Sequence, residues 1–247
     1  MRFLTVEVLV VVFVASLVRS VFGFGEALIA VPLLAFFLPI QIAVPLAVLI
    51  SITIAGVIVA QDWRKIHLRS TMWLFLPTLA GIPLGIGLLK FAHQDLIKSL
   101  LALVILLFSV YALLGRRSLH LEHDSHAWMF GCGFLAGVLG GAYGMNGPPL
   151  VVYGAMRRWS PQHFRATLQA YFLPASAIGM AGYALSGLWT KPVTHYFLIS
   201  LIAAIPATLL GTLVNRRLRG DAFLRYVYMG LICIALGLLT QALQHHV

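Results

Sequence analysis

Two interruptions rich in glycine and proline hold the residues best suited to binding chemistry. One lies at residues 22–32 (FGFGEALIAVP) and the other at residues 143–153 (YGMNGPPLVVY), about half a chain later. A helix broken inside a membrane leaves free amide N–H groups and a partly positive dipole end at the start of its second piece. Two such ends predict an anion-binding concavity. Its candidate residues are Gly23, Gly25, Gly144, Asn146, Gly147, Pro148, Pro149 and the hydroxyl of Tyr143, with Tyr153 as an alternative source of a hydroxyl.

Two ionisable residues, Arg19 and Glu26, stand beside the first interruption. A charge in the hydrocarbon region costs at least ~2.5–3.5 kcal/mol, so each needs a partner or a purpose. Three interpretations stay open: a mutual ion pair, Arg19 as ligand of the anion with Glu26 as a proton-coupling carboxyl, or Arg19 reaching out to the membrane surface. Gln169 is predicted to face the polar interior, and Ser51 and Thr53 are weaker candidates because hydroxyls often bond back to their own helix.

The composition sets the class of protein. Hydrophobic residues make up 61% of the chain and charged residues only 10%, against roughly 25% charged in a soluble domain. Apolar runs such as 42–60 and 96–114 approach the ~20 residues that a helical span needs. The alternating ten-residue strands of an outer-membrane barrel are absent from the sequence. We therefore predict an all-α, polytopic integral membrane protein.

The apolar runs divide the chain into two similar halves. Residues 1–115 and 128–247 are the predicted repeats, joined by a cytoplasmic linker at 116–127. Gly23 matches Gly144, and Ile82 matches Ile205 at a similar shift. Five segments per half is an odd number, so the second copy is predicted to be inverted. The segments are 4–22, 27–38, 42–60, 72–89, 97–114, 128–143, 148–157, 164–186, 194–214 and 222–243.

The basic residues predict the orientation. Lys and Arg gather in loops on one side when all ten segments cross, for example at Arg64, Arg116, Arg157 and Arg216. The positive-inside rule then places those loops in the cytoplasm and both termini outside a plasma (inner) membrane. The same rule accounts for the basic composition without nucleic acid. Counting the short segments 27–38 and 148–157 as loops that do not cross gives a weaker bias, so between eight and ten segments are expected.

Signals for other classes of site are weak. The run 120–126 (HLEHDSH) falls in the linker and fits no rigid metal-ligand spacing. Cys132 and Cys233 lie in apolar segments without a CxxC motif, so neither a metal site nor a disulfide is predicted. The sequence contains no phosphate-binding loop and no HExxH motif, which argues against an ATPase and an intramembrane enzyme. We expect no cofactor.

Several longer motifs resemble the TauE/SafE family of membrane transporters. They are FGFGEALIAVPLL, QDWRKI, GAYGMNGPPLVVY and FRATLQAYFLP, and together they extend over essentially the whole chain. The resemblance implies a carrier for sulfite, sulfoacetate or a related organosulfonate. We therefore expect a secondary transporter that exports a small anion by alternating access, with a homodimer left open. The alternatives are an anion channel and a structural subunit of a membrane complex.

Overall fold

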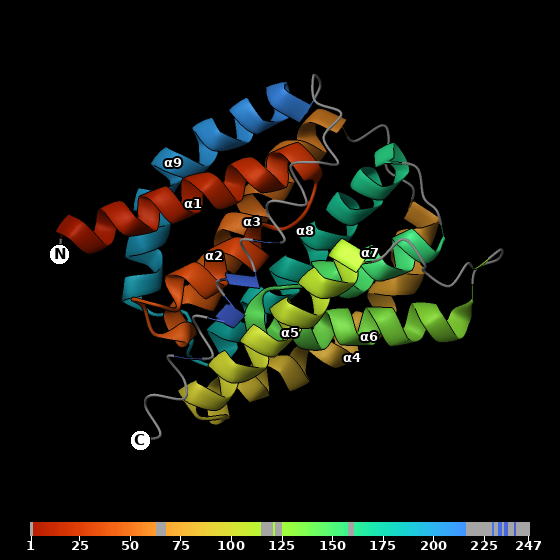
Figure 1. Cartoon of the computed structure of the whole chain (residues 1–247), viewed down its shortest axis with the longest axis horizontal. Helices are drawn as coiled ribbons and strands as arrows, with labels where there is room; N and C mark the ends of the chain where they lie inside the picture. The colour runs from red at the N-terminus through yellow and green to blue at the C-terminus, as the bar shows by residue number, and fades with distance from the viewer. Residues whose placement is uncertain are drawn as a thin grey trace.

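In the computed structural model, all regular secondary structure among the residues that it describes is helical. These are 2–62, 68–114, 121, 125–157, 161–215, 229, 232, 233, 235, 236 and 240. Nine helices are defined in this part of the chain (Figure 1): α1 Arg2–Phe22, α2 Glu26–Leu34, α3 Ile40–Asp62, α4 Leu68–Phe91, α5 Gln94–Leu114, α6 His126–Tyr143, α7 Gly147–Met156, α8 Pro161–Leu185 and α9 Lys191–Asn215. The predicted all-α membrane class is confirmed.

Each of the first nine predicted segments corresponds to one of these helices. Most of the predicted tenth segment, 222–243, lies outside the described residues, as does most of the linker 116–127. The observed helix boundaries differ from the predicted ones where apolar residues lie outside a helix. Segment 27–38 was predicted too long, because α2 ends at Leu34 and turns follow before Pro39. A proline disfavours helical backbone at the residue before it, here Leu38, which the apolar pattern does not reveal.

Five described helices are long and apolar enough to cross a membrane, namely α1, α3, α4, α5 and α9. By contrast, α2 has 9 residues and α7 has 10. At ~1.5 Å per residue each is about half as long as a ~30 Å hydrocarbon core is thick. A helix of that length begins or ends inside the membrane, so its terminal backbone groups need partners within the protein.

The long helices pack in pairs around these short ones. In Figure 1, α1 and α9 lie side by side along one edge of the molecule, and α4 lies beside α6 at the opposite edge. Helices α3 and α8 pack against each other between the two pairs. Because α2 packs on α1 and α3 while α7 packs mainly on α6, both breaks point into the middle of the bundle.

The α4–α6 pair is in backbone contact. Gly133, Gly137 and Gly141 lie four residues apart on α6 and meet α4 at Leu74–Ile86, where Gly81 and Gly85 face them. A methyl group added to any of these glycines would overlap backbone atoms of the partner helix. Small residues at this spacing allow the close helix approach that is typical of membrane interiors. The pair therefore forms a firm support for the second break.

The end of α7 is tied to the link between the halves. The Leu121 amide donates to the Met156 carbonyl at 3.1 Å, and Arg157 Nη1 donates to the Leu121 carbonyl at 2.8 Å. Leu121 lies five residues before the start of α6. The C-terminal end of α7 therefore returns to the same end of the bundle from which α6 begins.

Candidate functional site

The two breaks begin alike and then differ. Gly23 follows α1 with φ 86°, and Gly144 follows α6 with φ 67°. Each donates its amide to the carbonyl four residues earlier, Arg19 or Gly140. The left-handed backbone at these positions favours glycine. The residues just before the short helices differ in conformation: Gly25 has φ 98° before α2, whereas Asn146 has φ −70° before α7.

Both breaks line one small cavity at the centre of the bundle. It is lined by Arg19, Phe24–Leu28, Ser51, Gly144–Pro148 and Phe172. The cavity measures about 20 Å³, which is room for about one water molecule. Residues from the two halves of the sequence thus meet around one small space.

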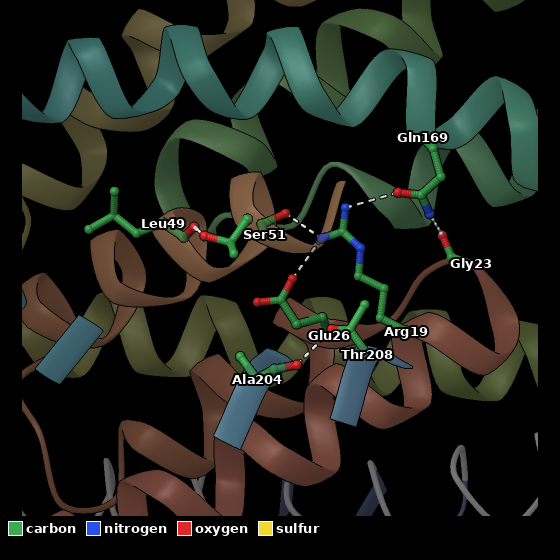
Figure 2. A network of polar contacts seen from close by, with 9 residues as sticks. Arg19, Gly23, Glu26, Leu49, Ser51, Gln169, Ala204 and Thr208 are labelled. Carbon is green, nitrogen blue, oxygen red and sulfur yellow. Dashed lines mark hydrogen bonds and ion pairs between the residues drawn. The ribbon is translucent and has the colours of Figure 1, made fainter. Parts of the chain in front are cut away.

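Arg19 is the centre of the polar contacts at this cavity (Figure 2). Its Nη1 donates to Glu26 Oε2 at 2.6 Å and also to the Ser51 hydroxyl, while Nη2 donates to Gln169 Oε1 at 3.3 Å. The guanidinium carbon lies 5.1 Å from the centre of the Phe172 ring. The Arg19 side chain is 3% exposed and that of Glu26 is 1% exposed. Of the three interpretations open for Arg19, the structure therefore contains the ion pair and not a side chain that reaches the surface.

Gln169 joins the network to the backbone of the first break. Its Nε2 donates to the Gly23 carbonyl at 2.7 Å while its Oε1 accepts from Arg19. Gln169 lies on α8, in the second half of the chain, whereas Gly23 and Arg19 belong to the first half. A single amide therefore fixes the end of α1 and the direction of the guanidinium across the interface between the halves.

The two short helices offer different numbers of amide donors. The first turn of α2 has N–H groups without an intrahelical partner at Gly25, Glu26, Ala27 and Leu28, since the first intrahelical bond runs from the Ile29 amide to the Gly25 carbonyl at 3.2 Å. In α7, Pro148 and Pro149 occupy the first turn and have no N–H. The start of α2 is therefore the richer anion cradle, and α7 contributes mainly its dipole and the amides at 146 and 147.

Asn146 is held by neighbours in the second half. Its side chain packs directly on Gly140, where a methyl group would overlap it. The Tyr171 hydroxyl hydrogen-bonds the Thr78 hydroxyl and interacts with Asn146. Thr78 in turn donates to the Gly133 carbonyl at 2.8 Å. Asn146 lines the cavity from a fixed position on the α4–α6–α8 framework.

The structure brings most of the predicted site residues together. Seven of them line the cavity: Arg19, Gly25, Glu26, Gly144, Asn146, Gly147 and Pro148. Gly23 and Gln169 hold the network from just behind it. The other two lie outside the lining. Pro149 is buried in α7, and the Tyr143 hydroxyl donates to the Ile97 carbonyl on α5 at 3.1 Å.

Sequence reasoning gave too little weight to Ser51 and no role to Phe172 or Tyr171. Ser51 accepts a hydrogen bond from Arg19, and Phe172 covers the guanidinium. Gln169 and Phe172 are three residues apart, so helix periodicity alone places them on one face. The Tyr171 hydroxyl bonds Thr78 of α4, a contact that the chain order does not reveal.

No group of three or more His, Cys, Asp or Glu side chains that could hold a metal ion occurs in the described residues. Of the predicted linker stretch 120–126, only Leu121, Ser125 and His126 are described. What the cavity does offer is a buried guanidinium, a carboxyl, a hydroxyl, an amide and the amino ends of two half-helices. These groups suit a small ligand with several oxygens.

Taken together, the bundle and its central site define a polytopic α-helical membrane protein with broken helices at a buried polar cavity. Broken helices that meet at a buried polar site occur in many membrane transporters. The family described as "Sulfite exporter TauE/SafE" matches residues 8–238, and the chain belongs to this family of membrane transporters. The probable sulfite/organosulfonate exporter TauE of Cupriavidus necator is 24% identical over 204 residues, covering 81% of this chain and 78% of that protein. No solved structure gives a significant match.

Proposed function

We propose that the protein exports a small, oxygen-rich anion of the sulfite or organosulfonate class by alternating access. The observation that carries the proposal is the buried Arg19 in a cavity that the amino ends of α2 and α7 both line. An arginine fork and helix amino ends each bind tetrahedral oxyanions in proteins. The name of the Cupriavidus necator relative supports the choice of substrate class.

The arrangement of helices supports an inverted repeat. Suppose that α1–α5 correspond in order to α6–α9 and the segment after them. The two-fold rotation that relates the halves then superposes the pair α1–α9 on the pair α6–α4. Both pairs are present, and α3–α8 lies where the two-fold axis would pass. Transporters built this way rock one half against the other around a site near the midplane. The cavity in its present size admits about one water, so it corresponds to a step of such a cycle in which the site holds no anion.

The orientation follows from the charge pattern. We propose a plasma-membrane protein with the Arg157 end of α7 and the start of α6 on the cytoplasmic side and the start of α1 outside. The contact of Leu121 with Met156 supports the part that concerns α6 and α7, because it places their outer ends together. Labelling a cysteine introduced at Ser125 from outside intact cells tests this; labelling by an impermeant reagent would contradict the orientation.

The transport proposal is tested by flux into proteoliposomes. We expect saturable uptake of a sulfonate, and reduced uptake in Arg19→Lys, because lysine keeps the charge but loses the fork that holds several oxygens. The matched control is Arg157→Lys, whose hydrogen bond is to the linker and not to the cavity. Flux that rises linearly with concentration would indicate a channel, and no flux of any anion would contradict the proposal.

A further inference from the structure

The carboxylate of Glu26 is an unexpected feature of an anion site. It lies at the first residue of α2, where the helix dipole attracts negative charge, and its Oε2 is held by Arg19 at 2.6 Å. Its other oxygen, Oε1, has no hydrogen-bond partner in the described part of the chain and is fully buried. Half of this carboxylate is thus unsatisfied at the wall of the cavity that it lines.

The guanidinium of Arg19 is already engaged on both terminal nitrogens. Nη1 bonds Glu26 and Ser51, and Nη2 bonds Gln169. Only Nε is without a partner among the described residues. A carboxylate and a sulfonate present oxygens to a guanidinium in the same way, so Glu26 occupies the place that a substrate oxyanion needs.

The size of the cavity leads to the same conclusion. About 20 Å³ is room for about one water and not for a sulfonate group. The substrate therefore requires displacement of a neighbour, and the Glu26 side chain is the one whose oxygen competes for Arg19. Figure 2 shows this carboxylate beside the guanidinium, with Ser51 and Gln169 on its other sides.

The charge balance adds a further condition. Arg19 and Glu26 are the only charged side chains among the described residues that line the cavity. Helices α1 and α3 pack on α2, and they contribute Arg19 and the neutral Ser51 to the cavity beside Glu26. Helix α5 also packs on α2, but its buried Lys98 does not line the cavity. The pair is neutral. Adding a monoanion leaves one uncompensated buried charge, which is costly, and a proton on Glu26 removes it.

We propose that Glu26 is a tethered competitor of the transported anion: a monoanion takes its place on Arg19, and Glu26 takes up one proton as the anion binds. A hydronium ion or buffer acid in the water on the side to which the site is open supplies the proton: its bond to hydrogen breaks, and an O–H bond forms on a carboxylate oxygen of Glu26. The inference rests on the proposed anion site. It makes the site selective for single negative charges, so a sulfonate monoanion is preferred over the sulfate dianion.

The test uses methanesulfonate, which remains a monoanion throughout the working pH range. Calorimetric titration of the whole protein in lipid nanodiscs, from about pH 6 to about pH 9 in buffers of different ionisation enthalpy, gives both the Kd and the protons taken up. Where Glu26 is ionised in the empty protein, we expect about one proton per anion and a Kd that rises about tenfold per pH unit, because proton and anion binding are reciprocally linked.

Glu26→Gln removes the competitor and the titrating group. We expect it to bind methanesulfonate without proton uptake and with a Kd that does not change with pH. The matched control is Glu7→Gln, an exposed carboxyl on α1, which should behave like the unaltered protein. If Glu26→Gln does not fold because Arg19 is left unpaired, the proton count on the unaltered protein still decides the question.

The outcomes separate the two proposals. Methanesulfonate binding to the unaltered protein with no proton uptake and a constant Kd would overturn the role of Glu26 and leave the anion site intact. No methanesulfonate binding at any pH would overturn the anion site and, with it, this inference. Tighter binding of sulfate than of methanesulfonate at the same pH would also contradict the inference.

Discussion

Replacing Gly25 by alanine tests whether the backbone of the first break forms the anion cradle. Gly25 precedes α2 with φ 98° and ψ −2°, a left-handed conformation that residues with a side chain rarely adopt. An added methyl group would meet only Val18 Cγ1 at 3.9 Å, an ordinary contact. Gly25→Ala therefore changes the preference of the backbone and almost nothing else.

The size of the effect follows from that preference. Left-handed backbone costs an alanine about 1–2 kcal/mol relative to right-handed helix. Since ~1.4 kcal/mol is a factor of ten, the cradle geometry loses a factor of about 5–30 in population. The apparent Kd for an anion rises by the same factor, because only the competent geometry binds. Gly144→Ala should raise the apparent Kd by a larger factor, since its methyl group would also lie 2.8 Å from Val48 Cγ2.

The assay is methanesulfonate binding in nanodiscs together with thermal unfolding. Gly56→Ala is the matched control, because Gly56 lies within helix α3 and an added methyl group would meet nothing within 4 Å. Alanine there should stabilise the helix by about 0.5–1 kcal/mol and leave the Kd unchanged. If Gly25→Ala binds as tightly as Gly56→Ala, the break does not form the cradle and the argument is wrong.

Three further changes separate the site from its support. Gln169→Leu leaves Arg19 Nη2 and the Gly23 carbonyl without their partner, at about 1–3 kcal/mol. The anion Kd should therefore rise by about 5- to 150-fold. Gln94→Leu, at an exposed Gln–Gln contact, should not change the Kd. Tyr143→Phe should lower the unfolding free energy by about 1 kcal/mol and leave the anion Kd unchanged, because the Tyr143 hydroxyl bonds Ile97. A higher Kd for this variant would indicate that Tyr143 contributes to the anion site. Gly137→Ala should destabilise the protein by about 1–3 kcal/mol, because the added methyl group would overlap the backbone of α4. The control is Gly131→Ala, whose methyl group would meet nothing within 4 Å. Equal melting temperatures for the two variants would contradict the α4–α6 packing.

The helices were predictable because membrane spans depend on length and hydrophobicity, which are local properties. Glycines and prolines likewise marked both breaks, since backbone conformation at Gly23 and Gly144 is decided by the residue itself. The end of α2 was less predictable. Phe36, Phe37 and Leu38 continue the apolar pattern beyond Leu34, and the pattern does not show where the hydrogen-bonded helix stops.

The site was predictable where the sequence gives a chemical reason and not where only the packing does. Buried charge required a partner for Arg19, and Glu26 at a spacing of seven residues was a natural choice. Tyr143 also stands at a break, yet its ring points to α5. Which side of the second break faces the cavity depends on how α6 packs on α4, and that contact joins residues far apart in the sequence.

The number of amide donors at each short helix was harder to predict. Pro148 and Pro149 suit a helix start, because the first turn makes no use of their missing N–H groups. The same prolines remove the N–H groups that an anion-binding end would use. The structure thereby assigns most of the backbone donors to α2, next to Arg19, and the chemical asymmetry of the cavity follows from this.

The central claim is that Arg19 binds the transported anion between the two breaks. The most direct test is the initial rate of sulfonate uptake into proteoliposomes, measured against concentration for the unaltered protein, Arg19→Lys and Arg157→Lys. We predict saturable uptake and a loss of about 10- to 100-fold in kcat/KM for Arg19→Lys alone, the size expected when hydrogen bonds from a charged group are lost. Equal kcat/KM for all three folded proteins would contradict the claim.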